Sequence, residues 1–188
     1  MKKLFVAYFL FIFINVFSQK PCEISTDVKD SIGTYKTTKD YLVFESNFST
    51  TKEYVYFYLA NTDGTPTLNV QFINKSSGFI KAKCIDKNSK LYFKLQNGNI
   101  VTLIPIDKTD CGTLLIDDKK LNTRVLAGSF LFLKGSMDDL KKSPISFMKI
   151  KLLTETKDYV FTKNLKSEMD SLYYEPENYF INFLHCIE

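Results

Sequence analysis

The stretch that most constrains the fold runs from Gly135 to Phe161, because it places a short helix, a stop and two strands in a fixed order. Ser136 stands where a helix cap is expected, and Asp139 three positions later completes a capping-box pattern. Pro144 ends the helix, since the residue before a proline is pushed into an extended conformation. The pattern therefore predicts a short helix that begins at Ser136 and stops before Pro144.

The residues after this helix alternate as a strand with one buried face requires. Met148, Ile150 and Leu152 are apolar, and Lys149 and Lys151 lie between them. A period of two places the apolar side chains on one face of a strand. We expect a buried strand here, then a tight reversal and a second strand.

A β-hairpin is expected where Asn97-Gly98 separates apolar runs at 91–95 and 100–104. Asn-Gly is the strongest short hairpin signal, because both residues accept the positive φ angles of a tight turn. The stretch at 79–84 predicts a third strand that completes a meander. Residues 19–30 are expected to be irregular, and further strands are expected over 32–37, 41–45, 53–60, 67–73, 113–117 and 124–134.

The strands lie at short spacing, and one amphipathic helix follows Pro176 near the end of the chain. This order predicts a mainly β (α+β) fold. We expect a single antiparallel β-meander domain, either a barrel or a sandwich, with one short internal helix and a C-terminal helix.

Residues 1–18 have the pattern of a secretion signal peptide. Lys2 and Lys3 precede an almost wholly apolar run that ends at Val16, and Val16 and Ser18 satisfy the small-residue rule before a cleavage site. A retained membrane anchor is the alternative, although the run is short for the roughly 20 residues that span a bilayer. We expect cleavage after Ser18, one β-rich domain over 19–188, and a secreted or periplasmic location in a bacterial cell envelope.

The charge of the chain bears on its partners. Removal of Lys2 and Lys3 lowers the formal net charge from +4 to +2, and the remaining lysines are scattered. Proteins that bind nucleic acid carry a clustered basic patch instead. The sequence therefore predicts no nucleic-acid partner, and membrane contact only through an uncleaved leader.

All four cysteines, Cys22, Cys84, Cys111 and Cys186, follow the leader. An even number of cysteines in an exported chain favours two disulfides, for which three connectivities exist. Cys84 and Cys111 fall at the same end of the expected meander. We therefore predict Cys84–Cys111 and, by elimination, Cys22–Cys186; free buried thiols are the alternative.

A row of tyrosines is the most suggestive binding feature. Tyr54, Tyr56 and Tyr58 alternate with apolar residues, so they share the face of a strand that is opposite the core. Aromatic rings in a row on an exposed sheet stack on sugars, bases or a protein partner. The alternative is that these strand-forming residues are half-buried under a loop or helix. Arg124, the only arginine, is a candidate for anion binding or for pairing with a carboxylate.

No catalytic residue, metal site or cofactor is predicted. The only histidine, His185, is next to Cys186 in the expected C-terminal helix, where adjacent positions do not face each other. The sequence lacks the close Cys and His spacing of a zinc site, a phosphate loop, a dinucleotide fingerprint and a nucleophile elbow. Carboxylates are the remaining route to acid–base chemistry, which requires a defined separation across a cleft.

Several motifs resemble those of small exported bacterial proteins of uncharacterised function: Asn97-Gly98-Asn99-Ile100-Val101, Ser143-Pro144 before Met148-Lys149-Ile150-Lys151, and Tyr179-Phe180 before Leu184-His185-Cys186. This resemblance covers most of the mature chain and implies no functional residues. A remote resemblance to lipocalin-type barrels rests on size, the expected meander, the late helix and Ile32-Gly33-Thr34-Tyr35, where lipocalins carry Gly-x-Trp. It implies a barrel that holds a small apolar ligand.

Together these features predict an exported binding or interaction module for an unknown protein, glycan or small-molecule ligand. The alternatives are a carboxylate-dependent hydrolase of the cell envelope and a carrier of a small apolar ligand. A tyrosine-bearing sheet face favours binding, a pocket with two or more carboxylates favours the enzyme, and a filled core excludes the carrier.

Overall fold

The computed structural model of the protein describes residues 20–106, 109–116, 118 and 120–188, so the expected leader at 1–18 lies outside the described residues. The described elements are β1 (Ile24–Lys29), β2 (Thr34–Thr38), β3 (Tyr41–Phe48), β4 (Thr51–Thr62), β5 (Thr65–Ser76), β6 (Lys90–Leu95), β7 (Ile100–Pro105), β8 (Thr113–Ile116), β9 (Asn122–Phe132), α2 (Ser136–Lys142), β10 (Ile145–Lys151), β11 (Thr156–Val160), β12 (Leu165–Lys166), β13 (Tyr173–Tyr174), the 3-10 turns η1 (Pro176–Asn178) and η2 (Leu184–Ile187), and α3 (Tyr179–Phe183). The fold is mainly antiparallel β with two helices, as predicted.

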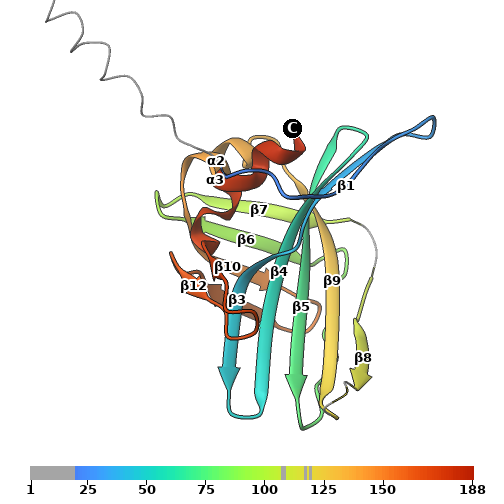
Figure 1. Ribbon diagram of the computed structural model, residues 1–188, viewed down its shortest axis with the longest axis vertical. Helices are drawn as coiled ribbons and strands as arrows, with labels where there is room; N and C mark the ends of the chain where they lie inside the picture. The colour runs from blue at the N-terminus through green and yellow to red at the C-terminus, as the bar shows by residue number, and fades with distance from the viewer. Residues whose placement is uncertain (1–19, 107–108, 117, 119) are drawn as a thin grey trace, which may run out of the picture.

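Eleven strands form one antiparallel sheet with the order β1-β2-β4-β5-β9-β7-β6-β10-β11, to which β3 is added beside β4 and β8 beside β9. The two end strands of this path do not pair with each other in the described part of the chain, so the sheet does not close into a barrel. Figure 1 shows β3, β4, β5, β9 and β8 running side by side, with β7, β6 and β10 crossing them at a steep angle.

The sheet bends so that its two halves face each other across one core. Phe57 on β4 contacts Phe93 on β6 at 6.0 Å between ring centroids, although three strands separate β4 from β6 in the sheet. Tyr159 on β11 likewise contacts Phe72 on β5 at 5.7 Å. Because these rings come from opposite halves, a two-layer sandwich made from a single sheet describes the architecture better than a barrel.

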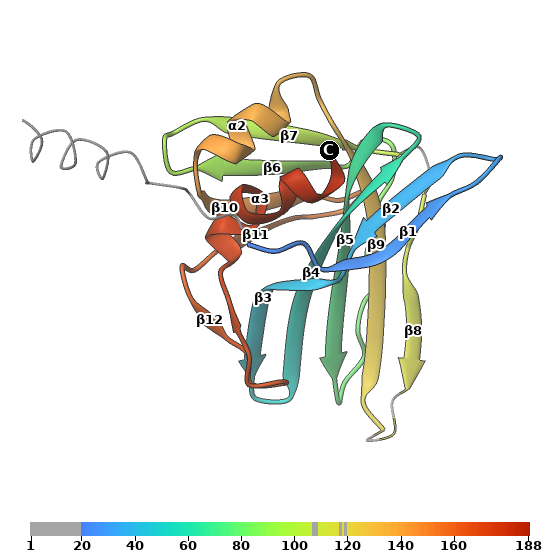
Figure 2. The ribbon, with the colours of Figure 1, turned by 45° about the horizontal axis from the view of Figure 1, so that its top comes forward.

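The C-terminal segment covers one end of this core. Phe180, Phe183, Leu184 and Ile187 are buried, as their helical spacing predicted, and Phe180 lies 5.2 Å from Phe93. The segment is not one continuous helix, because α3 lies between η1 and η2. Figure 2 shows α2 and α3 together at the end of the sheet where the crossing strands lie.

The alternating patterns form strands as predicted. Met148 and Ile150 of β10 are buried, and so is Leu152, which directly follows the strand. The apolar face of β4 is buried as well. The Asn97-Gly98 pair joins β6 to β7, with Gly98 at φ 92°. A second tight turn joins β4 to β5 at Asp63-Gly64.

Three local predictions were wrong. Residues 79–84 form no strand, because Phe79 is exposed rather than packed and only the adjacent Ile85 makes a bridge, to Asp110. Residues 24–29, expected to be irregular, form β1, which pairs with β2 and lacks a buried apolar face. Ser136 does not cap α2, because Gly135 takes the cap position in a left-handed conformation and no side chain caps the helix.

The two disulfides join Cys84 to Cys111 and Cys22 to Cys186, which is the predicted pairing. The first pair is positioned by the Ile85–Asp110 bridge, whose two backbone hydrogen bonds measure 2.8 and 3.0 Å, and not by a third meander strand. The second ties the start of the described chain to η2. Among the described residues, no helix has the length and apolar character needed to cross a bilayer.

Candidate functional site

The predicted tyrosine row lies on the face of β4 that is opposite the core. Tyr56 pairs with Gln71 of β5, and Tyr58 pairs with Asn69. Directly paired residues of antiparallel strands share a face, so two amide side chains stand beside the rings. We call Tyr54, Tyr56, Tyr58, Asn69 and Gln71 the tyrosine face.

The three tyrosines differ in exposure. Tyr54 is only 5% exposed, whereas Tyr56 and Tyr58 are half-buried. The segment after β12 lies against Tyr56, whose hydroxyl is 3.7 Å from the sulfur of Met169. Burial raises the pKa of Tyr56 to about 12, and burial also raises the pKa of Tyr58. The face is therefore partly covered, and the rings of Tyr56 and Tyr58 are its accessible part.

Two hollows lie along this face. One, of about 600 Å³, is lined by Tyr54, Tyr56, Lys52 and Glu168 among others. The other, of about 320 Å³, is lined by Tyr58, Asn69, Gln71, Asp110, Ile106 and Ser129 among others. Both volumes fall in the range of about 300–1,000 Å³ that ligand sites occupy.

The smaller hollow presents fixed and free polar groups next to a ring. The Ser129 hydroxyl donates a short hydrogen bond to the Asn69 side chain, which orients that amide. Asp110 is held by the Gly112 amide, which donates to its carboxylate at 2.8 Å. Within the described part of the chain, the amide of Gln71 and the hydroxyl of Tyr58 make no hydrogen bond, so both can serve a ligand.

Asn47 and Glu168 line the larger hollow, and the Asn47 amide joins Glu168 to Glu45. The side-chain nitrogen of Asn47 donates to Glu45 at 2.9 Å and to Glu168 at 2.8 Å. The Tyr54 hydroxyl donates to the side-chain oxygen of Asn47 at 3.4 Å. Burial, with smaller contributions from Glu45 and Glu168, raises the pKa of Tyr54. Glu168 lines the hollow, whereas Glu45 does not and is connected to it through Asn47.

Arg124 lies apart from the tyrosine face. It alternates with the residues of β9 that share the tyrosine side, and its Nε donates to the carbonyl of Ile80 at 3.2 Å. The side chain also lines a cavity of only about 20 Å³ between the sheet halves. A volume of this size holds about one water molecule. The structure therefore gives Arg124 a role in holding the 80s segment and does not bring it to the predicted site.

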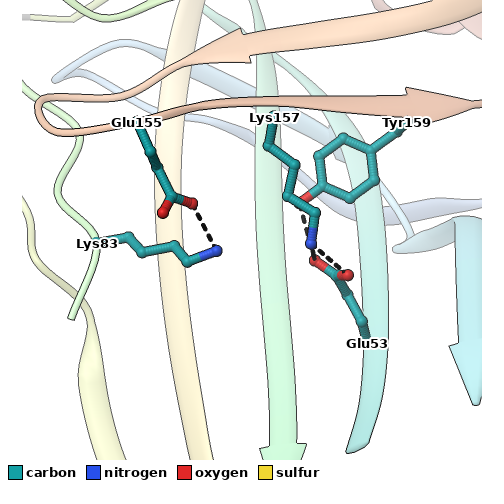
Figure 3. A network of polar contacts seen from close by, with 5 residues as sticks. All are labelled: Glu53, Lys83, Glu155, Lys157 and Tyr159. Carbon is teal, nitrogen blue, oxygen red and sulfur yellow. Dashed lines mark hydrogen bonds and ion pairs between the residues drawn. The ribbon is translucent and has the colours of Figure 1, made fainter. Parts of the chain in front are cut away.

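A polar network closes the mouth of the core near Arg124. Lys157 contacts both carboxylate oxygens of Glu53 at 2.5 Å, and the Tyr159 hydroxyl donates to Glu53 at 2.9 Å. Figure 3 shows Lys157 and Tyr159 reaching across to Glu53 of β4, with the separate Lys83–Glu155 pair beside them. Burial, and next the neighbouring Glu53 charge, raises the pKa of Tyr159 far above its ordinary value. Each donor has its acceptor, so we interpret this network as structural.

His185 lies beside the Cys22–Cys186 disulfide, with Nε2 3.1 Å from the Cys22 sulfur. Cys22, His185 and Cys186 form a group with metal-ligand spacing within the described residues. Their sulfurs are bonded to each other, however, so the thiolates that bind a metal or attack a substrate do not exist in this state.

Sequence reasoning missed Ser129 and Asp110, and it had a signal only for the β5 amides. Asn69 and Gln71 alternate with the buried side of β5, which marks them as outward-facing. Asp110 is placed by its bridge to Ile85 and Ser129 by the pairing of β5 with β9, and neither can be predicted from local patterns.

Comparison of the chain with protein-family models, with curated proteins and with solved structures found no match.

Proposed function

We propose that the protein is an exported binding module that holds a saccharide chain along its tyrosine face. The observation that carries the proposal is the smaller hollow, where the half-buried ring of Tyr58 stands beside the unpartnered amide of Gln71 and the carboxylate of Asp110. Sugars present an apolar face of C–H groups and a rim of hydroxyls. A ring beside hydrogen-bond donors and acceptors complements both features.

The arrangement of the hollows favours a chain over a single sugar. Tyr56 and Tyr58 are two residues apart on β4, so the two hollows are neighbours on the same sheet face. The rise of a strand separates such residues by about 6–7 Å. A ligand with repeated units can therefore place one unit near each ring.

The disulfides support the exported part of the proposal. Two disulfides among four cysteines are consistent with an oxidising environment outside the cytosol. Residues 1–18 would be removed as a signal peptide under this proposal. Intact-mass measurement of protein from its native host should then give a chain that begins at Gln19.

Calorimetric titration with a panel of soluble oligosaccharides tests the binding. We expect Tyr58→Ala to weaken the best ligand about tenfold, which corresponds to the loss of one aromatic contact of about 1.4 kcal/mol. Gln71→Ala should weaken it less, and Tyr92→Ala on β6, a half-exposed tyrosine away from the face, should leave it unchanged. If no oligosaccharide binds, or if Tyr92→Ala matters as much as Tyr58→Ala, the proposal is wrong.

A carboxylate-dependent hydrolase is the second candidate, and the Asn47 cluster is the observation that favours it. Two carboxylate oxygens that accept from one nitrogen are less than about 6 Å apart, since each hydrogen bond is about 3 Å long. Retaining glycosidases place their two carboxyl groups at about 5–5.5 Å. Under this alternative the protein releases reducing ends from a bound oligosaccharide, and Glu168→Gln abolishes the release while binding persists. A wild-type protein that binds without cleavage supports the binding module.

The apolar-ligand carrier is less consistent with the structure. The cavity between the sheet halves measures about 20 Å³, and the core is filled by aromatic side chains from both layers. A carrier needs an interior space of several hundred Å³.

A further inference from the structure

A separate cleft of about 420 Å³ lies between the two ends of the described chain. One wall is the segment at 20–23, which the Cys22–Cys186 disulfide fixes in place. The other walls are the corner between β2 and β3 and the residues around β13 and α3. This cleft shares no lining residue with the two hollows of the tyrosine face.

Five aromatic side chains line the cleft, and four of them form one cluster. The ring of Tyr41 lies 5.1 Å from Tyr174, 5.4 Å from Tyr179 and 5.0 Å from Phe183, measured between centroids. Tyr173 is the fifth; it is 71% exposed at the rim, and the Lys166 ammonium lies 5.7 Å from the centroid of its ring. Clustered rings of this kind offer electron-rich faces to a cation.

The charges of the lining leave one group uncompensated. Lys20 is paired with Glu175 at 2.9 Å, and Lys39 is paired with Glu23 at 3.3 Å. Asp40 makes neither a hydrogen bond nor an ion pair with any residue that the structure describes. With Glu175 counted, three carboxylates stand against the two lysines, so the cleft has a formal charge of −1 and favours a positively charged ligand.

A buried tyrosine hydroxyl that lacks a well-formed hydrogen bond also lines the cleft. Tyr179 is only 1% exposed, and among the described residues its hydroxyl lies near the Thr38 side chain without a hydrogen bond of normal geometry. Burial raises the pKa of Tyr179 well above its ordinary value, so this hydroxyl is a neutral donor. A buried hydroxyl of this kind costs free energy until a ligand or water satisfies it.

We propose that this cleft binds a small organic cation, with its ammonium group near Asp40 and its apolar body against the tyrosine rings. Cation–π contacts and one carboxylate are the elements by which proteins recognise alkylammonium groups. The inference does not depend on the tyrosine face, because the two sites are built from different residues.

Titration of the oxidised protein with choline tests this inference against 3,3-dimethylbutan-1-ol, the neutral isostere of choline. We expect saturable shifts of the amide signals of Asp40, Tyr41 and Tyr174 with choline and none with the alcohol at equal concentration. N-acetyl-lysine methylamide, which carries a primary ammonium, is the second arm. Tighter binding of one of the two cations identifies whether the natural ligand is a quaternary ammonium or a lysine-like amine.

Two exposed positions provide variants that should not perturb folding. Asp40→Asn should weaken choline about fivefold or more, and Tyr173→Leu should weaken it about two- to fivefold, as expected for one exposed cation–π contact. Asp27→Asn on β1 and Tyr92→Ala on β6 are the controls and should leave choline binding unchanged. The proposal is overturned if neither cation binds, if the alcohol binds as well as choline, or if Asp40→Asn has no effect.

Discussion

Glu53 is the shared acceptor of a polar network that joins the two halves of the sheet. Its side chain is only 13% exposed, and it accepts from both Lys157 and Tyr159 across the two halves of the sheet. The Lys83–Glu155 pair lies nearby in Figure 3 but is more exposed and lacks a third member. Both carboxylates therefore pair with a lysine, but Glu53 is more buried than Glu155 and also accepts from Tyr159.

Removal of Glu53 should be costly because it leaves two donors unpaired. We expect Glu53→Ala to lower the free energy of unfolding by about 3 kcal/mol, since breaking a largely buried pair leaves an uncompensated charge. Glu155→Ala is the matched control and should cost less than about 1 kcal/mol. Urea denaturation of both variants measures the difference, and equal costs would mean that the Glu53 network is not effectively buried.

The tyrosines predict how stability changes in alkaline solution. Burial raises the pKa of Tyr41, Tyr56 and Tyr159 in the folded state above the ordinary value near 10. The unfolded chain therefore loses these protons first, so stability is complete below pH 10 and falls as the pH rises above it. The free energy of unfolding should fall by about 1.4 kcal/mol per pH unit for each such tyrosine.

The slope of the free energy of unfolding against pH distinguishes tyrosine ionisation from a general loss of structure. Tyr159→Phe removes one titrating group, so its stability should fall less steeply between pH 10 and 11.5, although it is lower at pH 8 because a hydrogen bond to Glu53 is lost. Chemical denaturation at several pH values gives both slopes. A variant slope as steep as that of the wild type would show that Tyr159 does not contribute.

At the scale of elements, the start of α2 shows where a local pattern and the structure disagree. The sequence has the capping box of Ser136 and Asp139, yet the structure begins the helix with Gly135 at φ 81° and gives Ser136 no capping bond. The tight approach from β9 requires a left-handed residue before the helix, and glycine adopts it without strain. The helix and its stop at Pro144 were predictable, but the cap was not.

Substitution of Ser136 tests whether its side chain caps α2, and substitution of Ser89 provides the contrast. Ser136→Ala should change the free energy of unfolding by less than about 0.5 kcal/mol, because no cap is lost. Ser89→Ala is the contrast, since its buried hydroxyl donates to the Asp86 side chain at 2.9 Å and accepts from the Asp86 amide at 3.0 Å. We expect that change to cost about 2 kcal/mol. If Ser136→Ala costs as much as a lost cap, about 1 kcal/mol, then Ser136 caps the helix in solution.

Most strands could be predicted because their burial is one-sided. β4, β5 and β10 alternate with a period of two, and that period alone places Phe57, Val70 and Met148 in the core. β1 could not be predicted, because it lies at the edge and buries none of its side chains fully. Only part of the candidate site could be predicted, because alternation along a strand shows which side chains share a face but not which other strands and loops lie beside them. The Tyr56 and Tyr58 side of β4 follows from alternation, whereas its neighbours on β9 and the covering Met169 depend on tertiary pairing.

At the scale of the whole molecule, the disulfides close loops of different length. Cys22–Cys186 joins residues 164 positions apart, and Cys84–Cys111 joins residues 27 apart. In the chain-entropy model these closures stabilise the fold by about 5 and about 3.5 kcal/mol. The longer one also fixes the 20–23 wall of the cleft that Tyr41 and Tyr174 line, and the C-terminal segment that covers the core.

Paired alanine variants compare the two disulfides. The double substitution Cys22→Ala with Cys186→Ala should lower the urea midpoint more than Cys84→Ala with Cys111→Ala, and it should also abolish choline binding. The second pair of substitutions should leave choline binding intact. The opposite order of midpoints would show that the Ile85–Asp110 region, and not the closure of the two ends, dominates stability.

The most direct test of the saccharide proposal is an amide chemical-shift map of the oxidised, leader-free protein with the tightest oligosaccharide of the panel. We predict that the largest shifts fall on Tyr56, Tyr58, Gln71 and Ser129, along one sheet face, while Tyr41 and Tyr174 in the cation cleft stay unchanged. The account would be contradicted if no oligosaccharide shifts these signals, or if the shifts gather on another surface.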